Sequence, residues 1–359
     1  MLSLRAPAVV NKLPIRRLHS SQHAFQPVPT ITGPLNTFSV DEFRARAFTP
    51  ERPLLITAGD GKPRPGNEKG VKAPTCAIPA AEKWFTRKAS STTSEDAGEE
   101  DGFVILSQEY LAPFSSTILP YELITPHPSK SGPDTNANAD TMSELSTLLK
   151  HYTQYSSPSS TFHTFSAPLS LFLLASKCLA SSPSSPPPQT PQLYIAQAQL
   201  LSLPSPLQHD LPTPHLVSHA GKGDIYDSNL WLGLPPTYTP LHKDPNPNLF
   251  VQLAGRKQVR MFEPRVGGGI YRSVQGRIGR GGFGGGGQMR GSEMMEGPER
   301  GALWEAVWGD DGMEGRDGGA EEFEALVGPG DALFIPKGWW HSFRSVGGGV
   351  TGSVNWWFR

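Results

Sequence analysis

Cysteine is scarce in this sequence, with Cys76 and Cys178 alone among 359 residues. Two thiols are too few for the disulfide framework of a small secreted domain, and their separation matches no metal-ligand spacing. The cysteine count therefore excludes a disulfide-built domain, a zinc finger and any other cysteine-rich reader module. We expect a chain that folds around a hydrophobic core in a reducing compartment.

Long apolar runs and an excess of one charge are also missing. Apolar residues make up 37% of the chain, and no run of them approaches the roughly twenty residues that cross a bilayer. The 32 Lys and Arg residues nearly balance the 33 Asp and Glu residues, for a formal net charge of -1. Nucleic-acid-binding domains usually carry a clear basic excess. We therefore expect no membrane span and no nucleic-acid partner.

Acidic residues are absent from the beginning of the chain, where none precedes Asp41. The first 25 residues contain several basic and serine residues but no continuous apolar core. That composition is typical of a mitochondrial presequence rather than a secretory signal. Residues 1–25 therefore predict import into the mitochondrial matrix. The alternative interpretation is a solvated basic tail on a protein of the cytoplasm or nucleus.

Glycine and proline, in contrast, are abundant and clustered, with 38 and 36 residues. Segments rich in Ser, Pro, Asn or acidic residues bury too little apolar surface to offset the entropy of ordering them, so we interpret them as surface inserts. They are residues 90–101, 126–140, 156–160 and 180–191. A Gly-rich stretch at 266–319 lacks the Lys-Ser/Thr of a phosphate-binding loop, and we interpret it as an insertion between strands with one amphipathic helix at 299–308.

Residues 35–190 outside those inserts are predicted to form an α+β flanking region. The spacing of apolar residues predicts a short helix at 38–48, with Ser39 as its cap and Glu42 three residues on. Strands are predicted at 53–57 and 103–106, and a further helix at 169–178.

From 191 to 359, short apolar or alternating segments bounded by Gly or Pro favour a β-barrel or sandwich. The predicted strands are 194–197, 229–233, 249–253, 258–262, 332–335, 340–344 and 351–358.

One pair of residues in this second part has the spacing of metal ligands. His242 and Asp244 lie two residues apart on a predicted extended segment, where alternate side chains point to the same side. A histidine from a distant strand would complete a two-histidine, one-carboxylate set, which leaves coordination positions open on a non-haem Fe(II). His341 is the candidate for that third ligand, 97 residues beyond Asp244 (341 minus 244).

The surroundings of these residues resemble the JmjC branch of the cupin-like Fe(II)/2-oxoglutarate oxygenases, and especially the small JmjC hydroxylases without chromatin-reader modules. In that family Thr or Ser precedes the first His by three residues, Asn follows it by six and Lys by fifteen. Here those positions hold Thr239, Asn248 and Lys257. A further family Asn beside an aromatic pair matches Asn355, and the family strand whose Tyr contacts the cosubstrate matches Tyr194. So many family positions in the right order make a specific signal.

The resemblance implies a mainly β fold, a double-stranded β-helix or jelly roll of the cupin type with an N-terminal α+β flank. It implies Fe(II) as the metal, 2-oxoglutarate as the cosubstrate and O2 as the oxidant, acting on a protein or peptide substrate. The implied iron ligands are His242, Asp244 and His341. The implied contacts to 2-oxoglutarate are Lys257, Thr239 and Tyr194 at its far carboxylate, and Asn248 and Asn355 at its chelating end or the oxygen position.

The implied activity is that of a dioxygenase that hydroxylates an amino-acid side chain of a protein. Demethylation of N-methyl-lysine uses the same oxidant, so the motif leaves that alternative open, although the predicted presequence and the lack of reader modules weigh against a histone substrate. A non-catalytic cupin that binds a partner is a further alternative. So is a cupin dioxygenase or isomerase independent of 2-oxoglutarate, which would have no use for Lys257.

The tryptophans near the motif suggest how the pocket is walled. All five are interpreted as core or rim residues rather than substrate contacts, because large aromatic side chains dominate protein cores. They are Trp231, Trp339, Trp340, Trp356 and Trp357. Trp339 and Trp340 adjoin His341, so we expect one of them also to wall the metal pocket.

Overall fold

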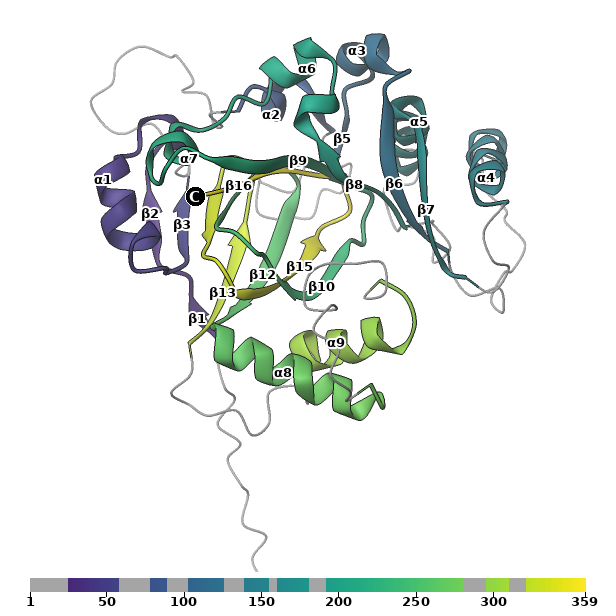
Figure 1. Cartoon of the computed structure of the whole chain (residues 1–359). Helices are drawn as coiled ribbons and strands as arrows, with labels where there is room; N and C mark the ends of the chain where they lie inside the picture. The colour runs from purple at the N-terminus through teal and green to yellow at the C-terminus, as the bar shows by residue number, and fades with distance from the viewer. Residues whose placement is uncertain are drawn as a thin grey trace, which may run out of the picture.

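The computed structural model describes residues 25–57, 78–88, 103–125, 139–154, 160–180, 192–280, 295–309 and 321–359. Within these ranges, two large β-sheets face each other and helices cover their outer surfaces (Figure 1). This mainly β arrangement confirms the predicted jelly roll with its flanking region. Three predicted segments lie wholly or partly outside the described residues. They are the predicted presequence apart from Phe25, most of the predicted surface inserts, and part of the Gly-rich insertion.

The smaller sheet has five strands in the order β1-β13-β12-β15-β10. They are β1 (Gln26–Pro27), β10 (Tyr238–Lys243), β12 (Arg256–Phe262), β13 (Glu322–Val327) and β15 (Trp340–Val346). The sequence analysis predicts β12 and β15 as strands and β10 as an extended segment, but it does not predict β13. Because β10 pairs antiparallel with β15, two distant parts of the chain lie side by side in this sheet.

The larger sheet has nine strands in the order β2-β3-β14-β11-β16-β9-β8-β6-β7. Its central strands are among the predicted ones: β8 (Gln192–Gln199), β9 (Ile225–Gly233), β11 (Asn248–Ala254), β14 (Ala332–Ile335) and β16 (Thr351–Phe358). The strands at its two ends precede residue 190: β2 (Thr30–Thr32), which lies just before the predicted flanking region, and β3 (Leu54–Thr57), β6 (Ile118–Ile124) and β7 (Phe162–Pro168) within it. Strands from both sides of residue 190 therefore share one sheet. A separate pair is formed by β4 (Phe85–Lys88) and β5 (Phe103–Leu106).

The residues of β16 show how the larger sheet separates the core from an internal cavity. Val354, Trp356 and Phe358 belong to the main hydrophobic core, which the flanking helices help to form. Asn355 and Trp357 lie on the opposite face and line the cavity. Since successive side chains of a strand point to opposite faces, one strand both stabilises the fold and builds the cavity wall.

Mostly short helices pack around the outer face of the larger sheet (Figure 1). Ser39 Oγ accepts a hydrogen bond from the Glu42 backbone N–H at 3.3 Å, which confirms the predicted helix cap. None of the helices in the described ranges is both long and apolar enough to cross a membrane. The flanking helices are α1 (Val40–Phe43), α2 (Ala80–Lys83), α3 (Gln108–Leu111), α4 (Ala139–Thr153), α5 (Leu169–Ala180), α6 (Ser205–His209) and α7 (His215–His219). A π-helical turn at Arg44–Phe48 continues α1. Short 3-10 turns occur at Leu35–Thr37, Ala112–Phe114 and Leu200–Ser202.

A buried carboxylate, Asp210, links several of these helices. It accepts hydrogen bonds from Lys83 Nζ at 2.6 Å, Trp84 Nε1 at 2.8 Å and Tyr110 Oη at 2.5 Å. Burial by itself would raise the pKa of Asp210, but these hydrogen bonds outweigh that effect and hold the pKa below its usual value. The ionised carboxylate therefore ties the ends of α2 and α6 to α3.

Two helices from the Gly-rich insertion, α8 (Pro264–Arg277) and α9 (Pro298–Trp308), cover the outer face of the smaller sheet (Figure 1). The insertion lies between β12 and β13, and α9 confirms the predicted helix, whereas α8 is not predicted. Gly267 shows why glycine occurs within α8. A Cβ atom there would lie 2.3 Å from the Cβ of Trp340 on β15, so glycine allows the helix to approach the strand closely.

Candidate active site

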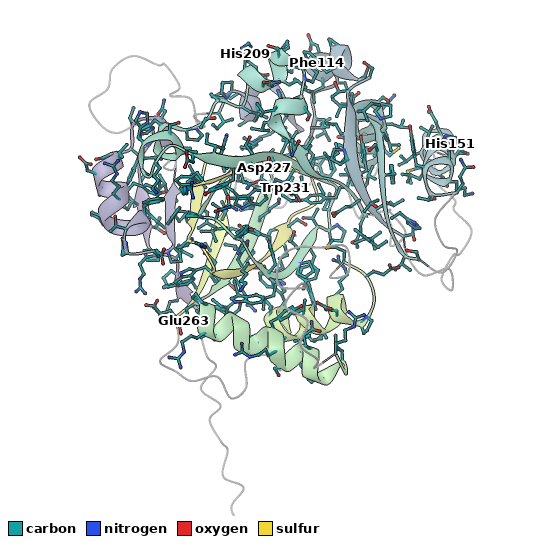
Figure 2. All side chains as sticks on the ribbon, viewed as in Figure 1. Phe114, His151, His209, Asp227, Trp231 and Glu263 are labelled. Carbon is teal, nitrogen blue, oxygen red and sulfur yellow. The ribbon has the colours of Figure 1, made fainter. Side chains whose placement is uncertain are left out.

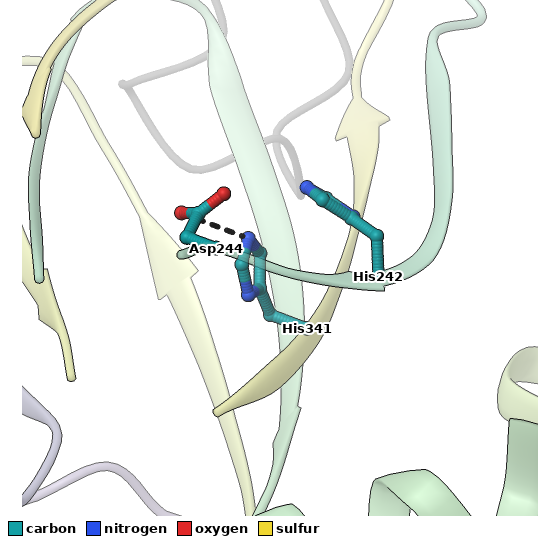
Figure 3. Close-up of side chains that lie close together, drawn as sticks. All are labelled: His242, Asp244 and His341. Carbon is teal, nitrogen blue, oxygen red and sulfur yellow. Dashed lines mark ion pairs between the residues drawn. The ribbon is translucent and has the colours of Figure 1, made fainter. Parts of the chain in front are cut away.

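His242, Asp244 and His341 lie together on the cavity side of the smaller sheet (Figure 3). Each offers one ligand atom, these atoms lie within 4.8 Å of one another, and all three side chains are buried. His242 and His341 are register partners on β10 and β15, and Asp244 follows β10 directly. The structure thus brings together the three residues that the sequence predicts as iron ligands.

An irregularity in β10 brings Thr239 into the same cavity as His242. Residues three apart on a regular strand point to opposite faces, yet both of these side chains line the cavity. The register of β10 against β15 shifts between the two residues, and such a bulge changes the direction of a side chain. The bulge therefore explains how a threonine three residues before the histidine shares its pocket.

Backbone carbonyls fix the two imidazole rings. His242 Nδ1 lies 2.8 Å from the Pro240 carbonyl oxygen, and His341 Nδ1 lies 3.1 Å from that of Trp339. Since a carbonyl oxygen can only accept, each Nδ1 is the donor in its contact, and Nε2 is the ring nitrogen that faces the other candidate ligands. Metal-binding histidines commonly have such a second hydrogen bond, which sets the tautomer of the ring.

The charge of Asp244 also fits a metal centre. Its side chain is buried, and a buried carboxylate is costly unless a cation or hydrogen-bond donors compensate it. His341 Nε2 lies 3.6 Å from Asp244 Oδ2, too far for a hydrogen bond. A divalent cation between two imidazole nitrogens and one carboxylate would supply the missing positive charge, and this donor set suits Fe(II).

The three residues line a cavity of about 330 Å³ between the two sheets. That volume is sufficient for a small ligand. The other five residues that the resemblance assigns to 2-oxoglutarate line the same cavity: Tyr194, Thr239, Asn248, Lys257 and Asn355.

Lys257 is buried, with 3% of its surface exposed. Its Nζ donates to Ser353 Oγ at 3.0 Å and to Tyr194 Oη at 3.2 Å, and it lies 5.5 Å from the ring centre of Phe250. A carboxylate beside Lys257 would meet one cation and the two hydroxyl groups that contact it, which offsets its desolvation.

Asn248 and Asn355 connect Asp244 to the cavity wall. Asn248 Nδ2 donates to Asp244 Oδ2 at 2.8 Å, and Asn355 Nδ2 donates to Asn248 Oδ1 at 3.2 Å. Trp231 Nε1 in turn donates to Asn355 Oδ1 at 2.7 Å. Both asparagines therefore line the cavity and also hold a candidate metal ligand through hydrogen bonds.

The tryptophans that wall the cavity are not the expected ones. Neither Trp339 nor Trp340 lines it, so that prediction is wrong, and Trp231 and Trp357 line it instead. Trp340 is the neighbour of His341 on β15, so its side chain points to the opposite face and packs against α8 and α9. Because neighbouring residues of a strand point to opposite faces, the residue next to a candidate metal ligand faces away from the cavity.

Sequence reasoning also misses polar residues on the cavity side of β9 and β16. Ser353 contacts Lys257, and Asp227 lines the cavity together with Trp231 on the same strand, β9 (Figure 2). The signal on β16 was the alternation of polar and apolar residues at Ser353, Val354 and Asn355, which assigns every second side chain to the cavity.

Comparison with known proteins agrees with this site. The family described as "Cupin-like domain" matches residues 129–359, which is more than half of the chain. "Lysine-specific demethylase 8" is 27% identical over 167 residues in Xenopus tropicalis, covering 46% of this chain and 32% of the relative. The protein of the same name in Danio rerio is 29% identical over 168 residues, covering 46% and 36%. "JmjC domain-containing protein D" of Dictyostelium discoideum is 24% identical over 165 residues, covering 43% and 32%. The chain thus spans about a third of the length of each relative.

Proposed function

The chain belongs to the cupin-like domain family, and on that premise we propose that it is a JmjC-type, Fe(II)- and 2-oxoglutarate-dependent dioxygenase that hydroxylates a protein side chain. One observation carries the proposal: a single cavity contains both a buried His-Asp-His set and a buried lysine. The set fits Fe(II), and the lysine fits the far carboxylate of a dicarboxylic acid. A cupin enzyme that works without 2-oxoglutarate has no need of that lysine.

Fe(II) held by His242, Asp244 and His341 would supply O2 activation coupled to the oxidative decarboxylation of 2-oxoglutarate to succinate and CO2. The side chains around it bind and orient the reactants. Lys257 would neutralise the far carboxylate, and Tyr194, whose hydroxyl accepts a hydrogen bond from Lys257, would lie beside it.

Apolar side chains restrict water in the same cavity. Phe250 and Phe343 line it from opposite sheets, with their rings stacked at 4.8 Å between centres. Exclusion of water strengthens the charge interaction of Lys257 with a bound carboxylate. The cavity is therefore suited to holding a small dianion beside the metal ligands.

The names of the two vertebrate relatives support a second candidate, demethylation of N-methyl-lysine. Both reactions need the same metal ligands and the same cosubstrate, and they differ in the carbon that is oxidised. The products distinguish them, because a hydroxylated protein gains an oxygen atom whereas demethylation releases formaldehyde.

The basic, acid-free composition of residues 1–25 supports a location in the mitochondrial matrix. The test is to image the chain with a C-terminal tag and to fractionate the cells. A matrix signal is expected, and a cytoplasmic or nuclear signal would favour the basic-tail interpretation.

The activity is tested by measuring succinate formation from 2-oxoglutarate by the purified chain with Fe(II) and O2. Lys257→Ala should abolish turnover while Fe(II) still binds. Lys337→Ala is the control, because Lys337 is exposed in the turn before β15. An iron-loaded Lys257→Ala variant with the wild-type rate would remove the 2-oxoglutarate assignment.

The substrate is sought with His242→Ala as an inactive bait in mitochondrial extracts. Captured proteins are then incubated with the wild-type chain and analysed by mass spectrometry. Addition of oxygen supports hydroxylation, and loss of a methyl group with formaldehyde release supports demethylation.

A further inference from the structure

Trp231 is the first member of a hydrogen-bond chain that ends on Asp244. The chain passes from Trp231 to Asn355, from Asn355 to Asn248 and from Asn248 to Asp244, with distances of 2.7, 3.2 and 2.8 Å. Its first three members lie on β9, β16 and β11, which are neighbours in the larger sheet. The chain therefore crosses three strands to reach a residue that follows β10, in the smaller sheet.

The chemistry of the two ends fixes the direction of this chain. An indole N–H can only donate, and an ionised carboxylate can only accept. Asn355 must therefore present its oxygen to Trp231 and its amide nitrogen to Asn248, and Asn248 must in turn present its amide nitrogen to Asp244. Swapping the oxygen and nitrogen of either amide would place two donors or two acceptors face to face.

Burial strengthens the hydrogen bonds of this chain. Asp244, Asn248 and Asn355 are all buried, so water competes little for their hydrogen bonds. Aligned amide dipoles polarise one another, and the last link is charge-assisted because it ends on a carboxylate. Removing the first donor therefore frees Asn355 to rotate and weakens the hold of Asn248 on Asp244.

We propose that Trp231 is a positioning residue for the metal centre, which it serves through Asn355 and Asn248 by fixing the orientation of the Asp244 carboxylate. This inference rests on the proposed function, because it takes Asp244 to be a metal ligand. Trp231 needs no contact with the metal, and its effect is on metal affinity and coordination geometry.

Trp357 provides a matched control in the same cavity. Like Trp231 it lines the cavity wall, and it lies on β16 two residues after Asn355. Its indole N–H, however, is buried without a hydrogen-bond partner among the described residues. Replacing either tryptophan by phenylalanine removes one indole from the cavity wall, but only Trp231→Phe removes a hydrogen bond directed toward Asp244.

The experiment titrates wild type, Trp231→Phe and Trp357→Phe with Co(II) and follows the visible absorption of the bound ion. Loss of a direct partner of a metal ligand typically lowers affinity about ten- to hundredfold, so loss of this more distant donor should raise the dissociation constant about three- to tenfold. The Co(II) band of Trp231→Phe should also change in position or intensity. Trp357→Phe should leave both the affinity and the band as in wild type.

Asn355→Asp tests the same chain with little change of shape. The carboxylate still accepts from Trp231 but has no N–H to give to Asn248, so Co(II) affinity should fall in the same direction. In the double variant the two effects should not add, because both substitutions break one chain. This variant also keeps the test decisive if circular dichroism shows that Trp231→Phe does not fold.

Two results would overturn the inference. The first is a folded Trp231→Phe or Asn355→Asp variant with wild-type Co(II) affinity and an unchanged Co(II) band. The second is an equal loss of Co(II) affinity in Trp231→Phe and Trp357→Phe. Failure of the proposed function gives a different result. A wild-type chain that binds Co(II) and responds to these substitutions, but forms no succinate, keeps the positioning role and loses the dioxygenase assignment. A wild-type chain that binds neither Co(II) nor Fe(II) contradicts both.

Discussion

His242 and His341 face each other as register partners on β10 and β15, although 99 residues (341 minus 242) separate them in the sequence. Their ring centres are 4.2 Å apart, with an angle of 55° between the ring planes. Both histidines are therefore held by the backbone hydrogen bonds of one sheet. A site built on paired strands is more rigid than one built on loops.

Removal of a candidate ligand should abolish metal binding without unfolding the sheet. We expect Asp244→Ala to lower Fe(II) affinity by more than about a hundredfold, which exceeds the usual effect of losing an outer partner. The measurement is iron content after anaerobic loading and desalting. Asp227→Ala is the control for iron content, because Asp227 lines the cavity but lies outside the ligand set. Full iron retention by Asp244→Ala would contradict the assignment.

Ser353 should contribute to cosubstrate affinity through Lys257. Ser353→Ala removes one hydroxyl from the Lys257 ammonium, and one hydrogen bond of about 1 kcal/mol corresponds to roughly a fivefold higher KM for 2-oxoglutarate. The matched control is Thr351→Val, because the Thr351 hydroxyl is buried on the same strand without a partner among the described residues. A Ser353→Ala enzyme with wild-type KM would show that this hydroxyl does not act on the cosubstrate.

Asp210 should make stability depend on pH in the acid range. Its pKa in the folded chain lies below its ordinary value, so its stabilisation is complete above the unfolded-state pKa of about 3.9 and is lost as the pH falls through the folded-state pKa. Asp210→Asn should lower the free energy of unfolding by about 1–3 kcal/mol at pH 7, because the new amide NH2 group replaces one acceptor oxygen and faces donors from Lys83, Trp84 or Tyr110.

The difference between wild type and Asp210→Asn in urea unfolding should shrink at acid pH. Asp224→Asn is the control at pH 7, because the Asp224–Arg359 ion pair is exposed and should contribute little to stability. A constant difference between wild type and Asp210→Asn across the acid range would show that the ionised form has no special role.

Two glycines of the same helix should respond in opposite ways to substitution by alanine. Gly267→Ala places a methyl group 2.3 Å from Trp340, and such overpacking typically costs about 1–3 kcal/mol. Gly269→Ala meets nothing within 4 Å and should stabilise α8 by up to about 1 kcal/mol, because alanine favours the helix. Thermal unfolding of both variants measures the contrast. Equal effects would mean that α8 does not pack on β15 at Gly267.

The sequence predicts the fold class and the eight candidate site residues that line one cavity, because their spacing follows a family pattern and most cavity strands alternate regularly. It does not explain how Thr239 and His242 share a face, since the bulge between them is set by pairing with β15. It also misses α8, because glycine is a poor helix former and the need for close packing at Gly267 arises only in the folded chain.

The sequence analysis misses some cavity residues because the sequence does not show which side of each sheet faces the cavity. Trp340 is next to His341 in the chain, but the pleat of β15 turns it away from the cavity. Ser353 and Trp231 face inward on strands whose partners are distant in sequence, so their hydrogen bonds become visible only after the strands are aligned.

Because His341 and Trp340 share one stretch of backbone, the helices behind the smaller sheet support the site from outside. Trp308 of α9 donates to Ser342, the residue after His341, and Ser342 donates to the Thr239 carbonyl of β10. Variation in the glycine-rich insertion can therefore alter the geometry of the candidate metal site without replacing any of its three candidate ligands.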